Sequence, residues 1–331
     1  METWNPAELL KLSGSYWSTC ALHAGVKLDL FTALAERDRS AAELADELSL
    51  DQRALAMLLD ALCALELLIK EGDRYRAVPA AAQFLSRTAP GYLGHIIRHH
   101  HHLMQSWNHL DQAVATGRPV RHRVSHEPTE AERESFLLGM FNLAMLSAPQ
   151  VTAHIDLSGR RRLLDLGGGP GTWAIHFCQC NPELSAVIFD LPTTRPFAAQ
   201  TLKRFAMEER IRFVAGDFLA DPLPGPFDVA WLSQVLHGEG PDGCALMLQK
   251  VVSALEPGGL LLVQEFVLDA DRAAPVFPAL FSLNMLLGTP QGQAYSELEL
   301  VALLEQAGLE QVERLPFDLP NGVGILQGRK P

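Results

Sequence analysis

The segment Leu163–Gly171, with the sequence LLDLGGGPG, constrains the fold of this chain more than any other stretch. An apolar run containing one acid leads into a glycine-rich turn, and residues 172–180 can continue as a helix. Strand, turn and helix form the unit of nucleotide-binding sheets, where glycines let the backbone approach a ligand without side-chain clash. Gly167, Gly169 and Gly171 have G-x-G-x-G spacing. A dinucleotide motif needs its third glycine one position later, so the spacing argues against NAD.

A second acid follows the next apolar run. Residues 186–189 lead into Asp190, which lies 190 − 171 = 19 residues after the last glycine. A carboxylate at the end of the second strand can accept hydrogen bonds from ribose hydroxyls. Asp165, the glycine turn and Asp190 together resemble the cofactor signature of class I S-adenosylmethionine (SAM) methyltransferases. The resemblance implies SAM as the cofactor, S-adenosylhomocysteine as its product, and no metal.

From residue 163 onward, predicted strands and helices alternate, which indicates an α/β fold with a Rossmann-like, doubly wound sheet. Further strands are expected at 211–215, 227–232 and 260–263, with a turn at 257–259 before the last of these. A helix at 297–307 and apolar runs near 311–317 and 323–327 predict a C-terminal β-hairpin.

The resemblance also implies a set of cofactor-binding residues. In the family, the acid after the third strand bonds the adenine amino group, and the next apolar residue packs on the ring. A basic residue often stands four positions before the catalytic histidine, where this chain has Ser233. The implied cofactor site comprises Asp165, Gly167, Gly169, Asp190, Leu191, Gly216, Asp217, Phe218 and Ser233.

Residues 1–90 have a separate, mostly helical pattern. Ser40 begins a capping box, and Asp51 can cap a longer helix. Residues 67–78 are predicted to form a hairpin around Gly72. These elements predict a winged helix. The candidate recognition helix has no basic stripe, and the net charge is −12, so packing is favoured over DNA binding. A first amphipathic helix is expected to contain Leu9, Leu10, Tyr16, Trp17 and Leu22.

The winged-helix segment resembles the dimerisation domain of small-molecule O-methyltransferases, which exchange helices with a partner subunit. The apolar surface from Trp4 to Leu34 exceeds what one small domain can cover. Exposed patches of this kind mark interfaces, so we expect a homodimer.

Residues 91–150 read as a helical connector that contributes to the acceptor pocket. Four consecutive histidines, His99–His102, point in different directions on a helix and cannot converge on one metal ion. A further helix is expected from Arg133 to Pro149, and its Phe136 and Met140 resemble the family's F-x-x-G-M segment. A lining of large apolar groups suits a planar aromatic or polycyclic molecule. The acceptor-site candidates are Trp107, Phe136, Met140, Met145, Phe281, Asn284 and Met285.

The candidate catalytic residues are His237 and Glu265. His237 follows the fourth strand, at the sheet edge where ligands of α/β folds bind, and Glu265 ends the neighbouring strand. Without further evidence, a surface histidine beside an ordinary glutamate would be the simpler interpretation. However, the residues from His237 to Cys244, HGEGPDGC, resemble the H-D-W-x-D-x-x-C stretch of plant caffeic acid and acetylserotonin-type O-methyltransferases. The family's second assisting acid falls at Ala294, which leaves Glu265 alone to support the base.

The resemblance implies a SAM-dependent O-methyltransferase of secondary metabolism, which methylates a hydroxyl of an aromatic or polycyclic small molecule with His237 as general base. The alternative is a SAM-binding relative that does not transfer methyl, such as a hydroxylase or a pericyclase. Retention of both His237 and Glu265 favours the first function. Replacing Glu265 by Gln is expected to cost less than losing His237, because an amide could still hold the ring.

Composition sets the remaining expectations. The odd count of five cysteines predicts reduced thiols rather than a disulfide framework. The first residues lack a signal-peptide pattern, and no uncharged apolar run reaches the roughly 18–20 residues of a membrane helix. We therefore expect a cytoplasmic protein with no nucleic-acid or membrane partner. Its expected parts are a dimerisation domain (1–90), a connector (91–150) and a SAM-binding domain (151–331).

Overall fold

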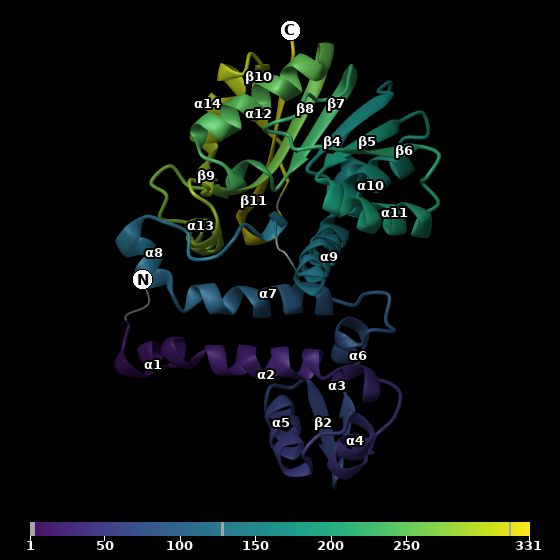
Figure 1. Ribbon diagram of the computed structural model, residues 1–331, viewed down its shortest axis with the longest axis vertical. Coiled ribbons are helices and arrows are strands. Elements are labelled where there is room, and N and C mark those ends of the chain that lie inside the picture. The colour runs from purple at the N-terminus through teal and green to yellow at the C-terminus, as the bar shows by residue number, and fades with distance from the viewer. Residues whose placement is uncertain (1–3, 127–128, 318) are drawn as a thin grey trace. The chain divides into compact units, whose positions relative to one another are not determined.

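The computed structural model describes residues 4–126, 129–317 and 319–331. The chain divides into two compact units, residues 1–104 and 105–331. Each unit has its own hydrophobic core (Figure 1).

The first unit is mostly helical with a small antiparallel sheet in the order β1-β3-β2. Helices α4 and α5 followed by the hairpin β2–β3 form the expected winged helix. The elements are α1 (Pro6–Gly14), α2 (Tyr16–Lys27), α3 (Leu30–Ala33), β1 (Arg39–Ser40), α4 (Ala41–Leu48), α5 (Gln52–Ala64), β2 (Leu68–Glu71), β3 (Arg74–Ala77), α6 (Pro79–Leu85) and α7 (Gly94–Trp107), which ends just beyond the unit's boundary.

The helix starts in this unit are as predicted, but the first helix is divided. Ser40 and Glu43 form the reciprocal capping box, and Asp51 Oδ1 accepts a hydrogen bond from the Ala54 amide at 2.8 Å. The expected single N-terminal helix is wrong, since α1 ends at Gly14 and α2 begins at Tyr16. Glycine is a poor helix former, and the Ser15 hydroxyl donates to the Leu12 carbonyl in competition with the helix bonds.

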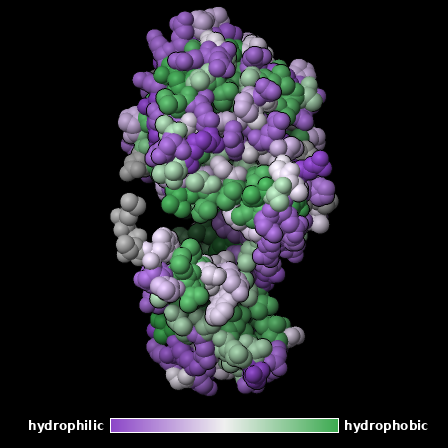
Figure 2. Space-filling view, turned by 90° about the vertical axis from the view of Figure 1, so that its left-hand side faces the viewer, coloured by the Kyte–Doolittle hydropathy of each residue, from purple (hydrophilic) through white to green (hydrophobic). Residues whose placement is uncertain are grey.

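The exposed apolar side chains of the first unit gather on α1 and α2. Leu10 is 73% exposed and Trp17 is 71% exposed, and α1 has no buried residue. Figure 2 shows hydrophobic side chains at the surface of this unit.

The second unit is built on one large sheet in the order β10-β11-β8-β7-β4-β5-β6. Strands β4 to β8 are parallel, and β10 and β11 form the antiparallel C-terminal hairpin. The elements are α8 (Leu110–Thr116), η1 (Val124–His126), α9 (Glu130–His154), β4 (Arg162–Leu166), α10 (Thr172–Cys180), β5 (Ser185–Asp190), η2 (Pro192–Thr194), α11 (Arg195–Arg204), β6 (Ile211–Ala215), β7 (Phe227–Ser233), η3 (Leu236–Gly238), α12 (Pro241–Ala254), β8 (Leu255–Leu268), α13 (Val276–Gly288), β9 (Tyr295–Ser296), α14 (Glu297–Gln306), β10 (Glu310–Arg314), η4 (Pro320–Gly322) and β11 (Val323–Arg329).

Two apolar layers cover the two faces of this sheet. Because side chains alternate along a strand, Leu164 and Leu166 enter the layer with α12 and α14, whereas Leu163 enters the layer with α9, α10 and α11. Figure 1 shows α12 and α10 against opposite faces. The predicted doubly wound α/β sheet is confirmed.

Two local expectations in this unit are wrong. Residues 257–259 lie inside β8, which begins at Leu255, and the pairing register with β7 shifts there, as in a β-bulge. Helix α9 continues through Pro149 to His154. Ala148 and Val151 are fully buried on either side of the proline, and their burial offsets the backbone hydrogen bond that proline cannot make.

Helix α9 is the one helix, among the described residues, that is long and apolar enough to cross a membrane. Its mean hydropathy reaches 1.3, but its Ala148 and Val151 side chains belong to the core under the sheet. We therefore interpret α9 as a core helix.

Candidate active site

The glycine turn after β4 adopts a backbone that other residues rarely reach. Gly167, Gly169 and Gly171 have φ of +63°, +55° and +82°. A Cβ at Gly167 would lie 2.8 Å from Val235 Cγ2, and one at Gly171 would lie 2.4 Å from Ile188 Cδ1. A Cβ at Gly169 would meet no atom within 4 Å. The turn is therefore packed against the protein at two glycines and open at Gly169, where a ligand can approach the backbone.

Asp165 on β4 is a buried carboxyl beside this turn. It is 1% exposed, and its Oδ2 accepts a hydrogen bond from the Ala174 amide at 3.2 Å. Oδ1 has no hydrogen-bond partner, and burial raises the pKa of Asp165 to about 7. An unpartnered acceptor is costly inside a protein, so this oxygen is suited to accept from a ligand.

Asp190 ties the end of β5 to the glycine turn. Its Oδ2 accepts from the Gly169 amide at 2.8 Å, and its Oδ1 accepts from the Leu191 amide at 2.6 Å and the Thr194 hydroxyl at 3.1 Å. Burial raises the pKa of Asp190. The Gly216 amide donates to the Asp190 carbonyl at 3.0 Å, so the turns after β5 and β6 are also joined.

The loop after β6 holds Asp217 and Phe218. Asp217 Oδ1 accepts from the Leu219 amide at 2.8 Å, and Phe218 packs against the core. Lys250 on α12 donates to the carbonyls of Phe218, Leu219 and Asp221 at 2.9, 2.8 and 2.8 Å. Lys250 could not be predicted from the sequence, because its partners are backbone carbonyls, which no sequence pattern identifies.

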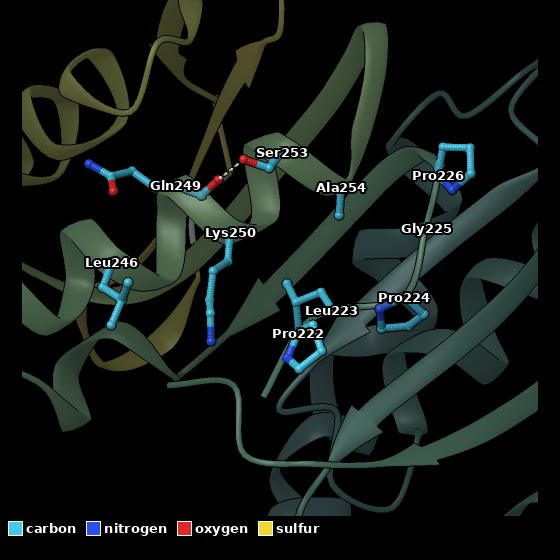
Figure 3. Close-up of a pocket in the computed structure, with 10 residues that line it drawn as sticks. All are labelled: Pro222, Leu223, Pro224, Gly225, Pro226, Leu246, Gln249, Lys250, Ser253 and Ala254. Atoms are coloured by element: carbon cyan, nitrogen blue, oxygen red, sulfur yellow. Dashed lines mark hydrogen bonds between the residues drawn. The ribbon is translucent and has the colours of Figure 1, made fainter. Parts of the chain in front are cut away.

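A hollow of the second unit is lined in part by Lys250 and lies away from His237. A groove of about 590 Å³, shown in Figure 3, is lined mainly by a proline-rich loop and by one face of α12. Pro226 directly precedes the amino end of β7, whereas His237 follows the carboxyl end of that strand. Seven strand residues span about 23 Å, so the groove is remote from the candidate base. Its lining residues are Pro222, Leu223, Pro224, Gly225, Pro226, Leu246, Gln249, Lys250, Ser253 and Ala254.

His237 and Glu265 form a hydrogen-bonded pair at the carboxyl ends of β7 and β8. His237 Nδ1 lies 2.8 Å from Glu265 Oε2. Glu265 is 1% exposed, and its Oε1 accepts from the amides of Leu236 and His237 at 2.8 and 3.3 Å. A carboxylate only accepts hydrogen bonds, so it selects the tautomer with hydrogen on Nδ1 and leaves Nε2 as the basic nitrogen.

Ser233 ends β7 next to this pair. Its hydroxyl donates to Gln264 Oε1 at 2.7 Å, and the Gln234 amide donates to the Gln264 carbonyl at 2.9 Å. Gln264 is 4% exposed, so Ser233 satisfies a buried amide beside Glu265.

The O-methyltransferase domain model matches residues 107–310, and the O-methyltransferase dimerisation domain model matches residues 10–87. The chain belongs to the O-methyltransferase family. It is 35% identical over 330 residues to the 3-hydroxy-5-methyl-1-naphthoate 3-O-methyltransferase of Streptomyces sahachiroi, covering 98% of this chain and 95% of the other. It is 34% identical over 332 residues to the tetracenomycin polyketide synthesis 8-O-methyl transferase TcmO of Streptomyces glaucescens, covering 98% and 97%.

A solved structure supports the same family. The crystal structure of human N-acetylserotonin methyltransferase in complex with SAM matches with a TM-score of 0.87 and 27% identity, over 100% of this chain and 99% of the other. The fold, the enzyme class and SAM as the methyl donor agree with the sequence expectations.

The acceptor-side candidates of this O-methyltransferase lie on several helices, and one of them contacts the histidine. The Phe281 ring on α13 stands edge-on to His237, with centroids 4.8 Å apart and planes at 84°. Asn284, one turn further on, accepts from Arg121 Nη2 through its carbonyl and its Oδ1 at 3.2 and 3.3 Å. Met285 is buried on the same helix.

The remaining candidates lie on α7 and α9. Trp107 ends α7, and Phe136 and Met140 are one turn apart and half-buried on α9. Met145 Sδ lies 3.2 Å from His176 Nε2 of α10, so this methionine contacts the helix that follows the glycine turn.

The loop before β9 supports the histidine from another direction and was missed in the sequence. The Gln293 amide donates to the His237 carbonyl at 2.9 Å. A Cβ at Gly292 would lie 2.6 Å from the same oxygen, so glycine is required for this approach. Ala294 is fully buried, and its amide donates to Ser282 Oγ at 3.0 Å.

Within the described ranges, no three His, Cys, Asp or Glu side chains are placed to hold a metal ion. The histidine run lies on α7, where His99 is buried and His100 is exposed. All five cysteines are free thiols.

Proposed function

We propose that this O-methyltransferase methylates a phenolic or enolic hydroxyl of an aromatic or polycyclic metabolite, with His237 as the general base. The hydrogen bond between His237 and buried Glu265, at the sheet edge that carries the glycine turn, is the observation on which the proposal rests. The activities that the relatives are named for, on a naphthoate and in tetracenomycin polyketide synthesis, support an aromatic acceptor.

The proposed cofactor site fits SAM. The open space at Gly169 accommodates a ligand close to the backbone, and Asp165 Oδ1 is an unused acceptor. SAM, when bound, supplies a methyl group whose bond to sulfur breaks as its bond to the acceptor oxygen forms. The residues proposed to hold it are Asp165, Gly167, Gly169, Asp190, Leu191, Gly216, Asp217, Phe218 and Ser233.

The task of the protein is to hold the acceptor hydroxyl and to remove its proton. A phenol with a pKa near ~10 is a weak nucleophile at neutral pH, while a histidine near ~6.5 can accept its proton. We assign this proton to His237 Nε2. Glu265 keeps the hydrogen on Nδ1 and stabilises the positive charge that the ring then carries.

The acceptor site is proposed to be mainly apolar. Phe281 packs against the base, and Asn284 follows on the same helix as a polar group. Such a lining favours a planar molecule that presents few charges. The other proposed wall residues are Trp107, Phe136, Met140, Met145 and Met285.

The expected assembly is a homodimer in the cytoplasm. The dimerisation-domain match and the exposed Leu10 and Trp17 support pairing through the N-terminal unit. We keep residues 1–90 as the dimerisation domain, 91–150 as the connector that contributes to the acceptor pocket, and 151–331 as the SAM-binding domain.

The test is a comparison of wild-type protein with His237→Ala. We expect the affinity for SAM to stay nearly unchanged by calorimetry while turnover of a phenolic acceptor falls by roughly 10²–10⁴. Raising the pH toward the phenol's own pKa should partly restore the rate, because the acceptor then ionises without a base. His154→Ala, an exposed histidine of α9, is the control. Wild-type turnover by His237→Ala at neutral pH would contradict the proposal.

A further inference from the structure

We infer that Arg123 is a positioning residue for His237, and that it neutralises a second carboxylate, Glu239, beside the base. The inference rests on the proposed function of His237 as general base. It concerns a segment before α9, residues 118–123, which the sequence patterns did not single out.

Residues 118–123 join α13, the helix that carries Phe281, to the loop that carries His237. The amides of Val120 and Arg121 donate to the Leu287 carbonyl at 3.0 and 3.1 Å, which anchors the segment at the end of α13. Two residues later, Arg123 Nη2 donates to the Gly238 carbonyl at 3.0 Å. One side chain therefore connects the helix that carries Phe281 to the residue next to His237.

Arg123 also forms an ion pair with Glu239. Its Nη2 lies 2.5 Å from Glu239 Oε1, and the two side chains are 28% and 16% exposed. A partly buried pair is less screened by solvent than a surface pair, so its loss has a larger electrostatic effect.

The residue between the base and Glu239 makes room for this contact. A Cβ at Gly238 would lie 2.4 Å from Arg123 Nη2. The motif that this loop resembles has Asp and Trp after the histidine, where this chain has Gly238 and Glu239. The loss of a side chain at 238 and the gain of a carboxylate at 239 are both matched to the guanidinium of Arg123.

The charges around His237 explain what this pair does for the base. Glu265 of β8 bonds the ring, Glu239 lies on the histidine's own loop, and Arg123 comes from the segment before α9. The uncharged groups are the Phe281 ring of α13, the Tyr295 hydroxyl, which donates to the Glu239 carbonyl, and the Cys244 thiol, which donates to the Leu236 carbonyl.

Without Arg123, Glu239 would carry an unpaired negative charge on the loop of His237, two residues after the base. A negative charge close to an imidazole favours the protonated ring over the neutral, proton-accepting one. Arg123 therefore balances the charge of Glu239 and holds the backbone next to His237 in place.

The pH profile of kcat/KM separates this role from a merely structural one. For Arg123→Met, we expect the acid limb of this profile to move to a higher pH by about 0.5–1 pH unit. Glu239→Gln leaves the guanidinium unbalanced and should move the limb in the opposite direction. The double variant Arg123→Met/Glu239→Gln should return the limb to its wild-type position, and Arg123→Lys, which keeps the charge, should leave it there. SAM affinity, measured by calorimetry, should stay within about twofold in each variant.

The matched control is Arg118→Met, an exposed arginine at the start of the same segment, which should not move the limb. An unmoved limb in both Arg123→Met and Glu239→Gln would overturn the inference, as would a double variant shifted as far as Arg123→Met alone. These outcomes are distinct from failure of the proposed function, in which His237→Ala itself keeps its rate. If Arg123→Met does not fold, Glu239→Gln and Arg123→Lys still decide the question.

Discussion

Glu265→Gln is a sharp test of the catalytic pair, because this change keeps the shape of the side chain and alters only its hydrogen-bonding capacity. Both Glu265 oxygens accept in the structure: Oε1 from the amides of Leu236 and His237, and Oε2 from His237 Nδ1. Glutamine has one accepting oxygen and one donating nitrogen. In either orientation, the amide nitrogen must face a donor.

From the sequence alone, this change is expected to cost less than the loss of His237, but the backbone donors on Oε1 lead us to expect a larger effect. If the glutamine oxygen stays with the two amides, its NH₂ faces Nδ1 and forces the hydrogen of the ring onto Nε2. His237 then has the wrong tautomer to accept a proton. A tautomer error of this kind costs about 10⁴ in the serine-protease triad, so we expect kcat to fall by roughly 10³–10⁴. In the opposite orientation, the glutamine NH₂ faces the buried amides of Leu236 and His237, and these opposed donors cost about 1–3 kcal/mol of folding free energy.

The assay is single-turnover methyl transfer followed by product mass, together with SAM calorimetry and urea unfolding. We expect the rate of Glu265→Gln to approach that of His237→Ala, with SAM affinity kept. Glu256→Gln is the control, because Glu256 lies on the same strand and is exposed. A rate for Glu265→Gln within threefold of wild type would refute the tautomer argument.

Three further predictions concern other parts of the chain. Because burial raises the pKa of Asp165 from 3.8 to about 7, the folded state holds the proton of this carboxyl up to a higher pH than the unfolded state does. The contribution of Asp165 to the free energy of unfolding therefore falls as the pH rises from about 4 to about 7. Asp165→Asn should remove this contribution, so that its free energy of unfolding in urea falls less between pH 5 and 7.5 than that of the wild type. An equal fall in the two proteins would contradict the prediction. Lys250→Met should weaken SAM binding about tenfold by calorimetry with kcat at saturating SAM kept, since the loop that we propose to hold the adenine loses three charge-assisted bonds, and unchanged affinity would refute it. Leu10→Asp/Trp17→Asp should yield monomers by light scattering, whereas a persistent dimer would place the interface elsewhere.

The fold was largely predictable because its signals are local. The glycine turn, the acids at the ends of β4 and β5, and the alternation of strands and helices are each encoded within a few residues. The capping box at Ser40 is complete in four residues and is confirmed in the structure. Such signals do not depend on distant parts of the chain.

The errors arose where tertiary packing overrides a local signal. A proline normally ends a helix, but α9 continues through Pro149 because residues on both sides of it are buried. Residues 257–259 have the composition of a turn, and Gly258 has a φ of +74°. The Gly258 amide donates to the Lys330 carbonyl and the Lys330 amide donates to the Gly259 carbonyl, both at 2.9 Å, and these bonds keep the bulged stretch of β8 in the sheet. In both cases the deciding partners lie far away in the sequence.

The candidate site divides in the same way. His237 and Glu265 lie within hydrogen-bond distance, as predicted, because His237 follows β7 and Glu265 lies near the carboxyl end of β8, and the order of these strands in the sheet could be inferred. Arg123 and Lys250 could not be found, since they bind backbone carbonyls 115 and 29–32 residues away. Every residue has a carbonyl, so an arginine or lysine that bonds one has no recognisable partner in the sequence.

The way the base loop is held also explains how its side chains could diverge from the family motif. The carbonyl oxygens of four consecutive residues, 236–239, each accept a hydrogen bond from a residue outside this stretch, and the four donors belong to three separate segments of the second unit. Bonds to the main chain fix the backbone without using the side chains of residues 238 and 239. Position 238 can therefore lose a side chain and position 239 can gain a carboxylate while the histidine between β7 and α12 keeps its place. The four donors are the Cys244 thiol at 3.2 Å from Leu236 O, the Gln293 amide at 2.9 Å from His237 O, the Arg123 guanidinium at 3.0 Å from Gly238 O, and the Tyr295 hydroxyl at 2.6 Å from Glu239 O.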